Sequence, residues 1–291
     1  MHLSRLSAVI SVIVAVRNGM PWLEEQLRAL AQQQCNEPWE VVVADNGSTD
    51  ESRMVVQEWA NRADMIRLID ASKVRGPGAA RNAGVRTAQG ELLAFCDADD
   101  IVQPGWLAGH VKALAEADVT AGVFDVWSLN GRGTPSPPTP VIIPNAMSQF
   151  GFLPAGGSGN LALRRHAFED VGGFAEEMMT GEDIDLCWRL QLRGHRYVVN
   201  SDAVVARRDQ RGFKAVYRRF TAYGRCGPVL YRRYRADGLR RDLTVAAKTW
   251  VWLAVSTPQL LRPDRRARWA SIAGWRTGRL VESLRQGVFF P

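Results

Sequence analysis

The residues in this sequence whose types and spacing most clearly suit chemistry are three aspartates in the tetrapeptide Asp97-Ala98-Asp99-Asp100. Carboxylates this close to one another are costly unless a cation or protons balance their charge. Hard oxygen ligands in an incomplete cage suit Mg²⁺ or Mn²⁺ shared with the phosphates of a substrate. A lone pattern of this kind is also frequent in solvated turns and helix caps. The tetrapeptide therefore indicates a metal site if other polar residues join it.

Two further polar groups follow apolar runs in the same way. If the runs are parallel strands, all of these groups emerge at the carboxyl edge of one sheet, where α/β proteins bind ligands. The groups are Arg17-Asn18 after residues 9–16, Asp45-Asn46 after 40–44, and the aspartates after 92–96. At such an edge Asp45 can accept a hydrogen bond from a base or a ribose, and Arg81 can face phosphate or base.

The pair Glu182-Asp183 offers a second acidic site. A positioned carboxylate can take the proton from a hydroxyl nucleophile. The same pair suits the N-terminus of a helix, where acidic side chains interact favourably with the dipole, and the two roles are compatible. Gly157 and Ser158 lie in a glycine-rich stretch that is consistent with an acceptor-side loop or with a plain turn.

The elements that must position these residues alternate in the first half of the chain. Short apolar runs alternate with amphipathic stretches, which predicts an α/β fold with a mainly parallel sheet flanked by helices. Pro21 suits the first position of a helix, and residues 48–51 have the spacing of a capping box before another helix. A strand is expected over residues 119–127, and five prolines predict a loop over 131–144.

Together these segments resemble the family 2 glycosyltransferases of the GT-A fold. The similarity spans residues 8–205, and six motifs in the same order carry it. The motifs are residues 12–18, 43–50, 78–84, 95–100, 171–174 and 181–186. The resemblance implies a GT-A type, Rossmann-like fold, with residues 1–205 as the glycosyltransferase domain.

The resemblance also implies roles for individual residues. Ala15 and Asn18 would line the nucleotide pocket, and Asp45 would contact the base. Asp99 would hold Mn²⁺ or Mg²⁺, and Asp183 would be the general base of a single displacement with inversion. The nucleotide-sugar contacts expected in total are Ala15, Arg17, Asn18, Asp45, Arg81 and Asp97.

One departure concerns a place where many relatives carry a histidine after a late strand. Here the strand leads to Ala206-Arg207-Arg208, so a histidine ligand is absent from that position. An arginine can supply positive charge to a diphosphate there instead. The candidate phosphate or acceptor contacts are therefore Arg208, Glu182, Gly157 and Ser158.

The charge of the chain is distributed unevenly. Residues 1–188 hold 14 basic and 24 acidic side chains, whereas residues 189–291 hold 23 and 6. Residues 206–291 are expected to form a basic helical extension rich in Trp and Arg. Its apolar part, 243–261, suits an interfacial or packed helix better than a spanning one. The basic surface predicts contact with an anionic membrane or, alternatively, a solvated face; no nucleic-acid partner is expected.

These features predict an inverting glycosyltransferase that moves a sugar from a nucleotide-diphosphate sugar to an acceptor hydroxyl, with a lipid-linked or cell-envelope glycan as the expected acceptor. Four well-separated cysteines indicate reduced thiols and a cytoplasmic protein. The basic extension predicts a peripheral position on the cytoplasmic face of the membrane. Two alternatives stay open. One is a sugar-1-phosphate nucleotidyltransferase, and the other is an inactive protein that binds a membrane or another anionic surface.

Overall fold

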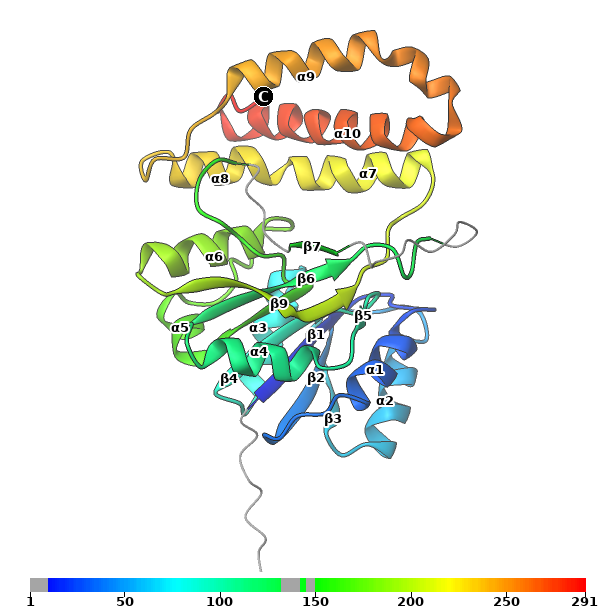
Figure 1. Cartoon of the computed structure of the whole chain (residues 1–291), viewed down its shortest axis with the longest axis vertical. Helices are drawn as coiled ribbons and strands as arrows, with labels where there is room; N and C mark the ends of the chain where they lie inside the picture. The colour runs from blue at the N-terminus through cyan, green and yellow to red at the C-terminus, as the bar shows by residue number, and fades with distance from the viewer. Residues whose placement is uncertain (1–9, 132–141, 145–149) are drawn as a thin grey trace, which may run out of the picture. The chain divides into compact units, whose positions relative to one another are not determined.

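The structure is a computed structural model that describes residues 10–131, 142–144 and 150–291. The chain divides into two compact units (Figure 1). The first holds residues 1–147 and 154–209, and the second holds residues 148–153 and 210–291.

The first unit is built on one mixed β-sheet. Its strand order is β3-β2-β1-β4-β8-β6-β9-β5, with β7 paired to β6. The strands are β1 (Ile10–Val16), β2 (Trp39–Asp45), β3 (Ile66–Asp70), β4 (Leu92–Asp97), β5 (Ile101–Val102), β6 (Val119–Asp125), β7 (Ile142–Pro144), β8 (Asn160–Arg164) and β9 (Tyr197–Ala206). The parallel pairing expected from the sequence holds for β1 to β4 and for β6 with β9, whereas β5, β7 and β8 pair antiparallel to their neighbours.

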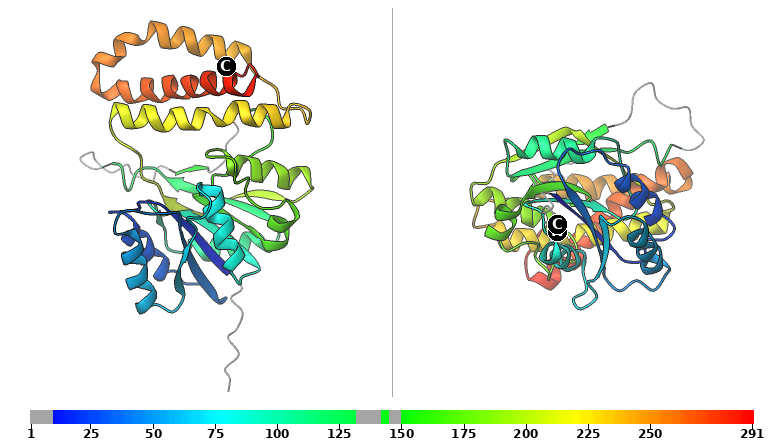
Figure 2. Two further views of the ribbon diagram at one scale, coloured as in Figure 1. Left: turned by 180° about the vertical axis from the view of Figure 1, so that it is seen from behind. Right: turned by 90° about the horizontal axis from the view of Figure 1, so that it is seen from below.

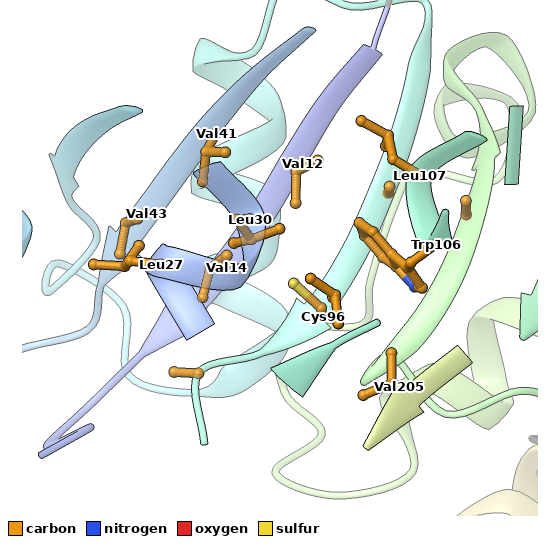
Figure 3. Close-up of a cluster of buried hydrophobic side chains, with 14 of the residues drawn as sticks. Val12, Val14, Leu27, Leu30, Val41, Val43, Cys96, Trp106, Leu107 and Val205 are labelled. Carbon is orange, nitrogen blue, oxygen red and sulfur yellow. The ribbon is translucent and has the colours of Figure 1, made fainter. Parts of the chain in front are cut away.

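Helices flank both faces of this sheet, as Figures 1 and 2 show from opposite sides. Alternate residues of a strand point to opposite faces, so Val12 and Val14 pack with Leu27 and Leu30 on one face (Figure 3). On the other face, Gly84 belongs to helix α3 (Pro77–Thr87), and a Cβ at this position would lie 2.5 Å from Ile13 Cγ2. Helix α3 therefore lies close against strand β1. The helices are α1 (Leu23–Ala31), α2 (Ser52–Arg62), α3 (Pro77–Thr87), α4 (Trp106–Leu114), α5 (Arg165–Asp170) and α6 (Glu182–Leu192).

Two helix starts differ from the sequence expectation. Helix α1 begins at Leu23, not at Pro21, and α2 begins at Ser52, so the predicted capping box is wrong. The hydroxyl of Ser48 instead accepts a hydrogen bond from the backbone N–H of Asn18, at 2.9 Å. A partner from the neighbouring strand end, 30 residues away, replaces the local cap.

The segment around the predicted proline-rich loop also differs. Strand β6 ends at Asp125, two residues before the expected end, because the Asp125 carboxylate accepts the N–H of Trp127 in a turn. Ile142–Pro144 forms β7 at the expected end of the loop and pairs with β6. Proline lacks an N–H and is therefore tolerated only where a strand needs no donor at that position. Residues 132–141 of the predicted loop lie outside the described residues.

The second unit consists of helices. They are α7 (Phe213–Gly224), α8 (Cys226–Tyr234), α9 (Leu243–Val255), the 3₁₀ helix η1 (Thr257–Leu261) and α10 (Pro263–Gln286). Within this unit α10 lies between α7–α8 and α9 (Figures 1 and 2). Among the residues that the structure describes, no helix is both long and apolar enough to cross a membrane.

Glycines allow the backbones of α7 and α10 to touch. A Cβ placed at Gly278 would lie 2.1 Å from the carbonyl oxygen of Thr221, and one at Gly274 would lie 2.4 Å from that of Tyr217. Real Cβ atoms do not approach backbone oxygens so closely. The spacing of these two glycines, one helical turn apart, therefore sets the distance between the helices.

Gly278→Ala is expected to lower the free energy of unfolding by about 1–3 kcal/mol, because the new methyl group must separate α7 from α10. Helix propensity alone predicts the opposite, a gain of about 1 kcal/mol. Urea unfolding followed by circular dichroism distinguishes the two signs. Ala267→Gly, at an exposed position of α10, is the control and tests propensity without the clash. A stabilised Gly278→Ala protein would contradict the close packing.

Candidate active site

The ends of three neighbouring strands meet at one edge of the sheet. In the parallel register, Val16 lies opposite Asp45 and Ala15 lies opposite Asp97. Arg17 and Asn18 follow directly and are exposed. The prediction that these polar groups share one carboxyl edge is thus confirmed by the strand register.

The three aspartates after β4 form a compact acidic cluster. One carboxylate oxygen from each of Asp97, Asp99 and Asp100 lies within 4.8 Å of the others, and the cluster grades from exposed Asp99 to buried Asp100. Burial, and then the neighbouring Asp97 and Asp99, raises the pKa of Asp100 to about 8. The backbone N–H of Arg208 donates to Asp100 at 2.8 Å and opposes that rise. Closely spaced hard oxygens with poorly compensated charge fit a divalent cation.

Gln26 holds the turn that carries this cluster. Its side-chain N–H donates to the main-chain oxygen of Asp97 at 3.0 Å, and its side-chain oxygen accepts the N–H of Val102 at 3.0 Å. Gln26 is fully buried on a helix whose other buried residues are leucines. A glutamine on the apolar face of α1 was the signal in the sequence that Gln26 could hold this turn, but Gln26 was not among the predicted site residues.

Arg81 joins the acidic cluster to the second acidic pair. One guanidinium nitrogen lies 2.8 Å from Asp97 Oδ1 and the other lies 2.9 Å from Glu182 Oε1. The Arg81 side chain is only 6% exposed. Burial alone would lower the pKa of Arg81, but Asp97 and Glu182 raise it above its usual value. Arg81, which the sequence predicted as a contact of the nucleotide-sugar, is therefore already paired with two carboxylates of the protein.

The pair Glu182-Asp183 begins helix α6. The preceding Gly181 has φ +79°, a conformation that favours glycine. Burial, and then the adjacent Asp183, raises the pKa of Glu182 to about 7, although Arg81 opposes this. The pair stands at the helix N-terminus, as one of its two expected roles requires, and Glu182 also faces Arg81.

Asp183 has the surroundings of a proton acceptor. Its two oxygens accept the N–H groups of Ser158, at 3.2 Å, and Ile184, at 2.8 Å. Burial raises the pKa of Asp183, while Arg81 and these N–H groups hold it down. A carboxylate whose proton affinity is raised can accept a proton as a general base.

Strand β8 brings small and polar groups beneath the cluster. A Cβ at Gly159 would lie 2.7 Å from Asp97 Oδ2, so a larger residue would displace that carboxylate. The next residue, buried Asn160, accepts a hydrogen bond from Trp106 at 2.8 Å and lies 2.9 Å from His110 Nε2. Burial lowers the pKa of His110 to about 4, so the ring is neutral and its Nε2–H donates. Gly157 contributes its carbonyl oxygen to the Asn160 N–H at 3.1 Å.

Asn160 was not among the predicted site residues. Its amide nitrogen donates to the carbonyl oxygens of Val123 and Ala203 at 2.9 and 3.0 Å, which joins three strands. No local pattern reveals such a role, because Trp106, His110, Val123 and Ala203 each lie at least 37 residues from Asn160 in the sequence.

At the other end of the edge, Asp45 is completely buried. Arg53 lies 2.7 Å from its carboxylate, and the Ser48 N–H donates to it at 3.2 Å. Asn18 has a positive φ of 55° and accepts the N–H of Thr49 at 2.8 Å. These contacts shape the expected nucleotide end, and Arg53 is a neighbour that the sequence did not indicate. Ala15 is half-buried beside them.

The arginines that replace the expected histidine are held by other side chains. The Arg208 guanidinium carbon lies 3.9 Å from the centre of the Trp22 ring, and the same side chain pairs with Glu25. Arg207 lies over Phe124 at 5.1 Å. The backbone N–H of Arg208 donates to Asp100 and so contacts the acidic cluster.

The fold is α/β, and its acidic and polar side chains gather at the ends of parallel strands, the edge at which such folds bind ligands. The family model of glycosyl transferase family 2 matches residues 11–172, which is more than half of the chain. The chain therefore belongs to glycosyl transferase family 2.

Two curated relatives show the range of similarity. The pre-mycofactocin glycosyltransferase of Mycobacterium tuberculosis is 29% identical over 219 residues, which cover 68% of this chain and 42% of that protein. The chain thus spans less than half the length of this relative. Glycosyltransferase AglE of Haloferax volcanii is 25% identical over 264 residues, covering 88% and 85% of the two chains.

A solved structure shares the fold. The mannosyltransferase PcManGT of Pyrobaculum calidifontis, in complex with GDP-Man and Mn²⁺, superposes with a TM-score of 0.65. The match covers 95% of this chain and 87% of that one, at 21% sequence identity. The likeness establishes the GT-A fold that the sequence predicted.

The acidic cluster predicts a pH-dependent stability. The usual pKa of an aspartate is about 3.9 and that of Asp100 is raised to about 8. Between these values the unfolded chain binds fewer protons than the folded chain, so stability falls as pH rises. Asp100→Asn keeps an oxygen for the Arg208 N–H and removes this loss. At pH 8.5 in EDTA, it is expected to raise the free energy of unfolding by roughly 1–4 kcal/mol.

Urea unfolding of both proteins from pH 4 to pH 9 measures this difference. The two stabilities should be similar near pH 4 and should diverge above it, and millimolar Mn²⁺ should narrow the gap at pH 8.5. Parallel pH profiles for the two proteins would show that the Asp100 carboxyl is not destabilised.

Proposed function

We propose that this protein is an inverting, metal-dependent glycosyltransferase of the hexosyl-transfer type, with Asp183 as its general base. The observation that carries this proposal is the Arg81 guanidinium, which bridges Asp97 of the acidic cluster and Glu182 beside Asp183. Arg81 therefore links Asp97, the proposed contact of the nucleotide-sugar, to the acidic pair that contains the proposed general base Asp183. A donor and an acceptor bound on the two sides of Arg81 would then meet.

The donor lies on the acidic-cluster side in this proposal. Asp99 would hold Mn²⁺ or Mg²⁺, a cation that stabilises a diphosphate leaving group, and Asp97 would contact the nucleotide-sugar. The Mn²⁺ and GDP-Man in the mannosyltransferase structure support this choice of cofactor and donor class. Asp45 is assigned to the base, and Ala15, Arg17 and Asn18 to the nucleotide pocket. Arg53 already pairs with Asp45. The heterocyclic base of the nucleotide would therefore bind Asp45 alongside Arg53 or displace Arg53 from it.

The acceptor lies on the Asp183 side. Asp183 accepts the hydroxyl proton while the hydroxyl oxygen forms its bond to the anomeric carbon and the bond to the diphosphate breaks. The Ser158 N–H keeps the carboxylate oriented during this step. Only one base and no second carboxylate nucleophile is assigned, so a single displacement inverts the anomeric centre. Gly157 lines the acceptor side with Ser158.

The acceptor is proposed to be lipid-linked or a cell-envelope glycan, with the enzyme peripheral on the cytoplasmic face of an anionic membrane. The second unit supports this, since residues 210–291 hold 18 basic and 4 acidic side chains. Family membership argues against the nucleotidyltransferase alternative. No observation specifically favours an inactive binding protein.

A panel of nucleotide-sugars tests the donor proposal. A ligand that binds the folded state raises the unfolding temperature, so the true donor should do so in Mn²⁺ and much less in EDTA. The donor that stabilises the protein is then used to follow the release of nucleoside diphosphate. If no nucleotide-sugar shifts the unfolding temperature and none is turned over, the proposal fails.

Asp183→Asn is expected to lower the transfer rate by about 10²–10⁴-fold, because an amide cannot accept the hydroxyl proton. The affinity for the donor should be unchanged, since the substitution lies on the acceptor side. Nucleoside diphosphate release and donor-induced thermal shifts measure the two quantities. Asp202→Asn, at an exposed carboxylate paired with Lys112, is the matched control and should retain full activity. An active Asp183→Asn protein would exclude this residue as the base.

Asp99→Asn is expected to weaken Mn²⁺-dependent donor binding at least about tenfold, since even the outer-shell partners of a metal contribute 10- to 100-fold to its affinity. Titration calorimetry with the nucleotide-sugar, in Mn²⁺ and in EDTA, measures this change. The Asp202→Asn control should bind as the wild type does. Equal Mn²⁺ dependence in the Asp99→Asn and wild-type proteins would place the metal elsewhere.

A further inference from the structure

Helix α9 presents apolar side chains to solvent along most of its length. Within its 13 residues only Ala246 and Leu253 are buried, and Lys248 is its one charged residue. Val251 is 62% exposed and Val255 is 71% exposed. A helix at the surface of a water-soluble domain normally carries charged and polar side chains on its outer side.

The packing of α9 explains which side is outward. Arg276 of α10 is buried, and it donates to Thr249 Oγ1 at 2.8 Å and approaches the carbonyl oxygen of Val245 at 3.4 Å. The indole N–H of Trp269 donates to the carbonyl oxygen of Leu253 at 3.2 Å. These contacts hold one side of α9 against α10. The opposite side carries Thr244, Ala247, Lys248, Val251, Ala254 and Val255, all of them exposed.

The apolar side continues beyond the helix. Leu261, at the end of η1, is 87% exposed, and Trp250, within α9 itself, is 40% exposed. We use the name α9 surface for Trp250, Val251, Val255 and Leu261 together with Lys248. Contiguous exposed apolar groups of this kind mark interaction sites, because leaving them in water is unfavourable.

Basic side chains border the α9 surface at both ends. Arg240 and Arg241 precede the helix, and Arg262, Arg265, Arg266 and Arg268 follow it. Arg268 lies 5.8 Å from the centre of the Trp252 ring. Arginine and tryptophan beside exposed aliphatic residues is the composition of segments that lie in the headgroup region of a bilayer.

We infer that the α9 surface docks on an anionic lipid bilayer, with the aliphatic side chains below the headgroups and the arginines at the lipid phosphates. With 13 residues, α9 is too short to span a bilayer and suits an orientation parallel to it. This inference names the element that makes the membrane contact of the proposed function and rests on that contact, but it does not depend on the proposed chemistry.

Charge favours a bilayer over other occupants of this surface. A second copy of the chain, related by a two-fold axis, would set the same arginines against each other, which is repulsive. Nucleic acid would use the arginines but would gain nothing from Val251, Val255 and Leu261. An anionic bilayer matches both the positive charge and the aliphatic residues.

Vesicle flotation with the full-length protein tests the inference. Vesicles of phosphatidylcholine alone are compared with vesicles that also contain phosphatidylglycerol, at low and high salt. The variant Val251→Asp/Val255→Asp changes two side chains that are mostly exposed. The control Met54→Asp places the same charge on α2 of the first unit, where Met54 is 57% exposed.

The wild-type protein and Met54→Asp should bind the anionic vesicles in a salt-sensitive manner, because the arginine contribution is screened. The double variant should bind at least about tenfold more weakly, because charged side chains resist insertion. Absence of wild-type binding, or equal binding by the double variant, would overturn the inference. So would self-association in sedimentation experiments that the double variant abolishes while vesicle binding is absent.

A second measurement separates this inference from the proposed chemistry. The thermal shift produced by a nucleotide-sugar and Mn²⁺ is recorded without vesicles, and the double variant should show the wild-type shift. A protein that binds vesicles through α9 but shows no nucleotide-sugar shift would refute the proposed donor and leave the docking surface intact. Loss of the shift in the double variant alone would indicate a folding defect and reject it as a test, in which case Val255→Asp and Leu261→Asp singly serve as the test variants.

Discussion

The first unit depends on one buried cation at an edge crowded with carboxylates. Arg81 reaches both Asp97 and Glu182 because helix α3 lies unusually close to the sheet. That closeness comes from small residues: Gly84 sits against Ile13, and Ala80 clusters with Ala44. A larger side chain at either position would lift α3 away, and the guanidinium could no longer span the two carboxylates. The packing of one helix thus sets the electrostatics of the whole site.

A single arginine does not balance all of the acidic groups, and this imbalance has a functional meaning. Burial raises the pKa values of Asp100, Glu182 and Asp183 even with Arg81 in place. Groups that weaken the folded state in this way are retained mainly where a ligand uses them. In the proposed function, a cation balances the charge of Asp100 and its neighbours, whereas Asp183 binds a proton. Two kinds of chemistry would then depend on the same set of charges.

The sequence predicted the parts of this site that local patterns encode. Strand ends at Val16, Asp45 and Asp97 follow from apolar runs, and parallel pairing then brings them to one edge without further information. Contacts between distant segments were not predictable. Ser48 has the local spacing of a helix cap, but a backbone N–H from another strand end is its partner. Asn160 and Gln26 support the site through hydrogen bonds to residues more than 35 positions away, and β7 needs β6 beside it. The resemblance to a family supplied the order of the motifs. The ion pairs that Arg81 and Asp45 form within the protein could be seen only in the folded structure.

The second unit reverses the usual arrangement of a surface helix, and its own packing shows why. The inner side of α9 is held by polar contacts, chiefly from buried Arg276, instead of by an apolar stripe. Arg279, one turn away on α10, is likewise enclosed, with Phe290 and Phe150 rings at 4.9 and 5.5 Å. Burying arginine in a small helical unit costs desolvation that aliphatic residues would avoid. Val251 and Val255 of α9 are on the outer side, where water gives them no stabilisation. In the proposed docking, the bilayer surface supplies a medium less polar than water for these side chains.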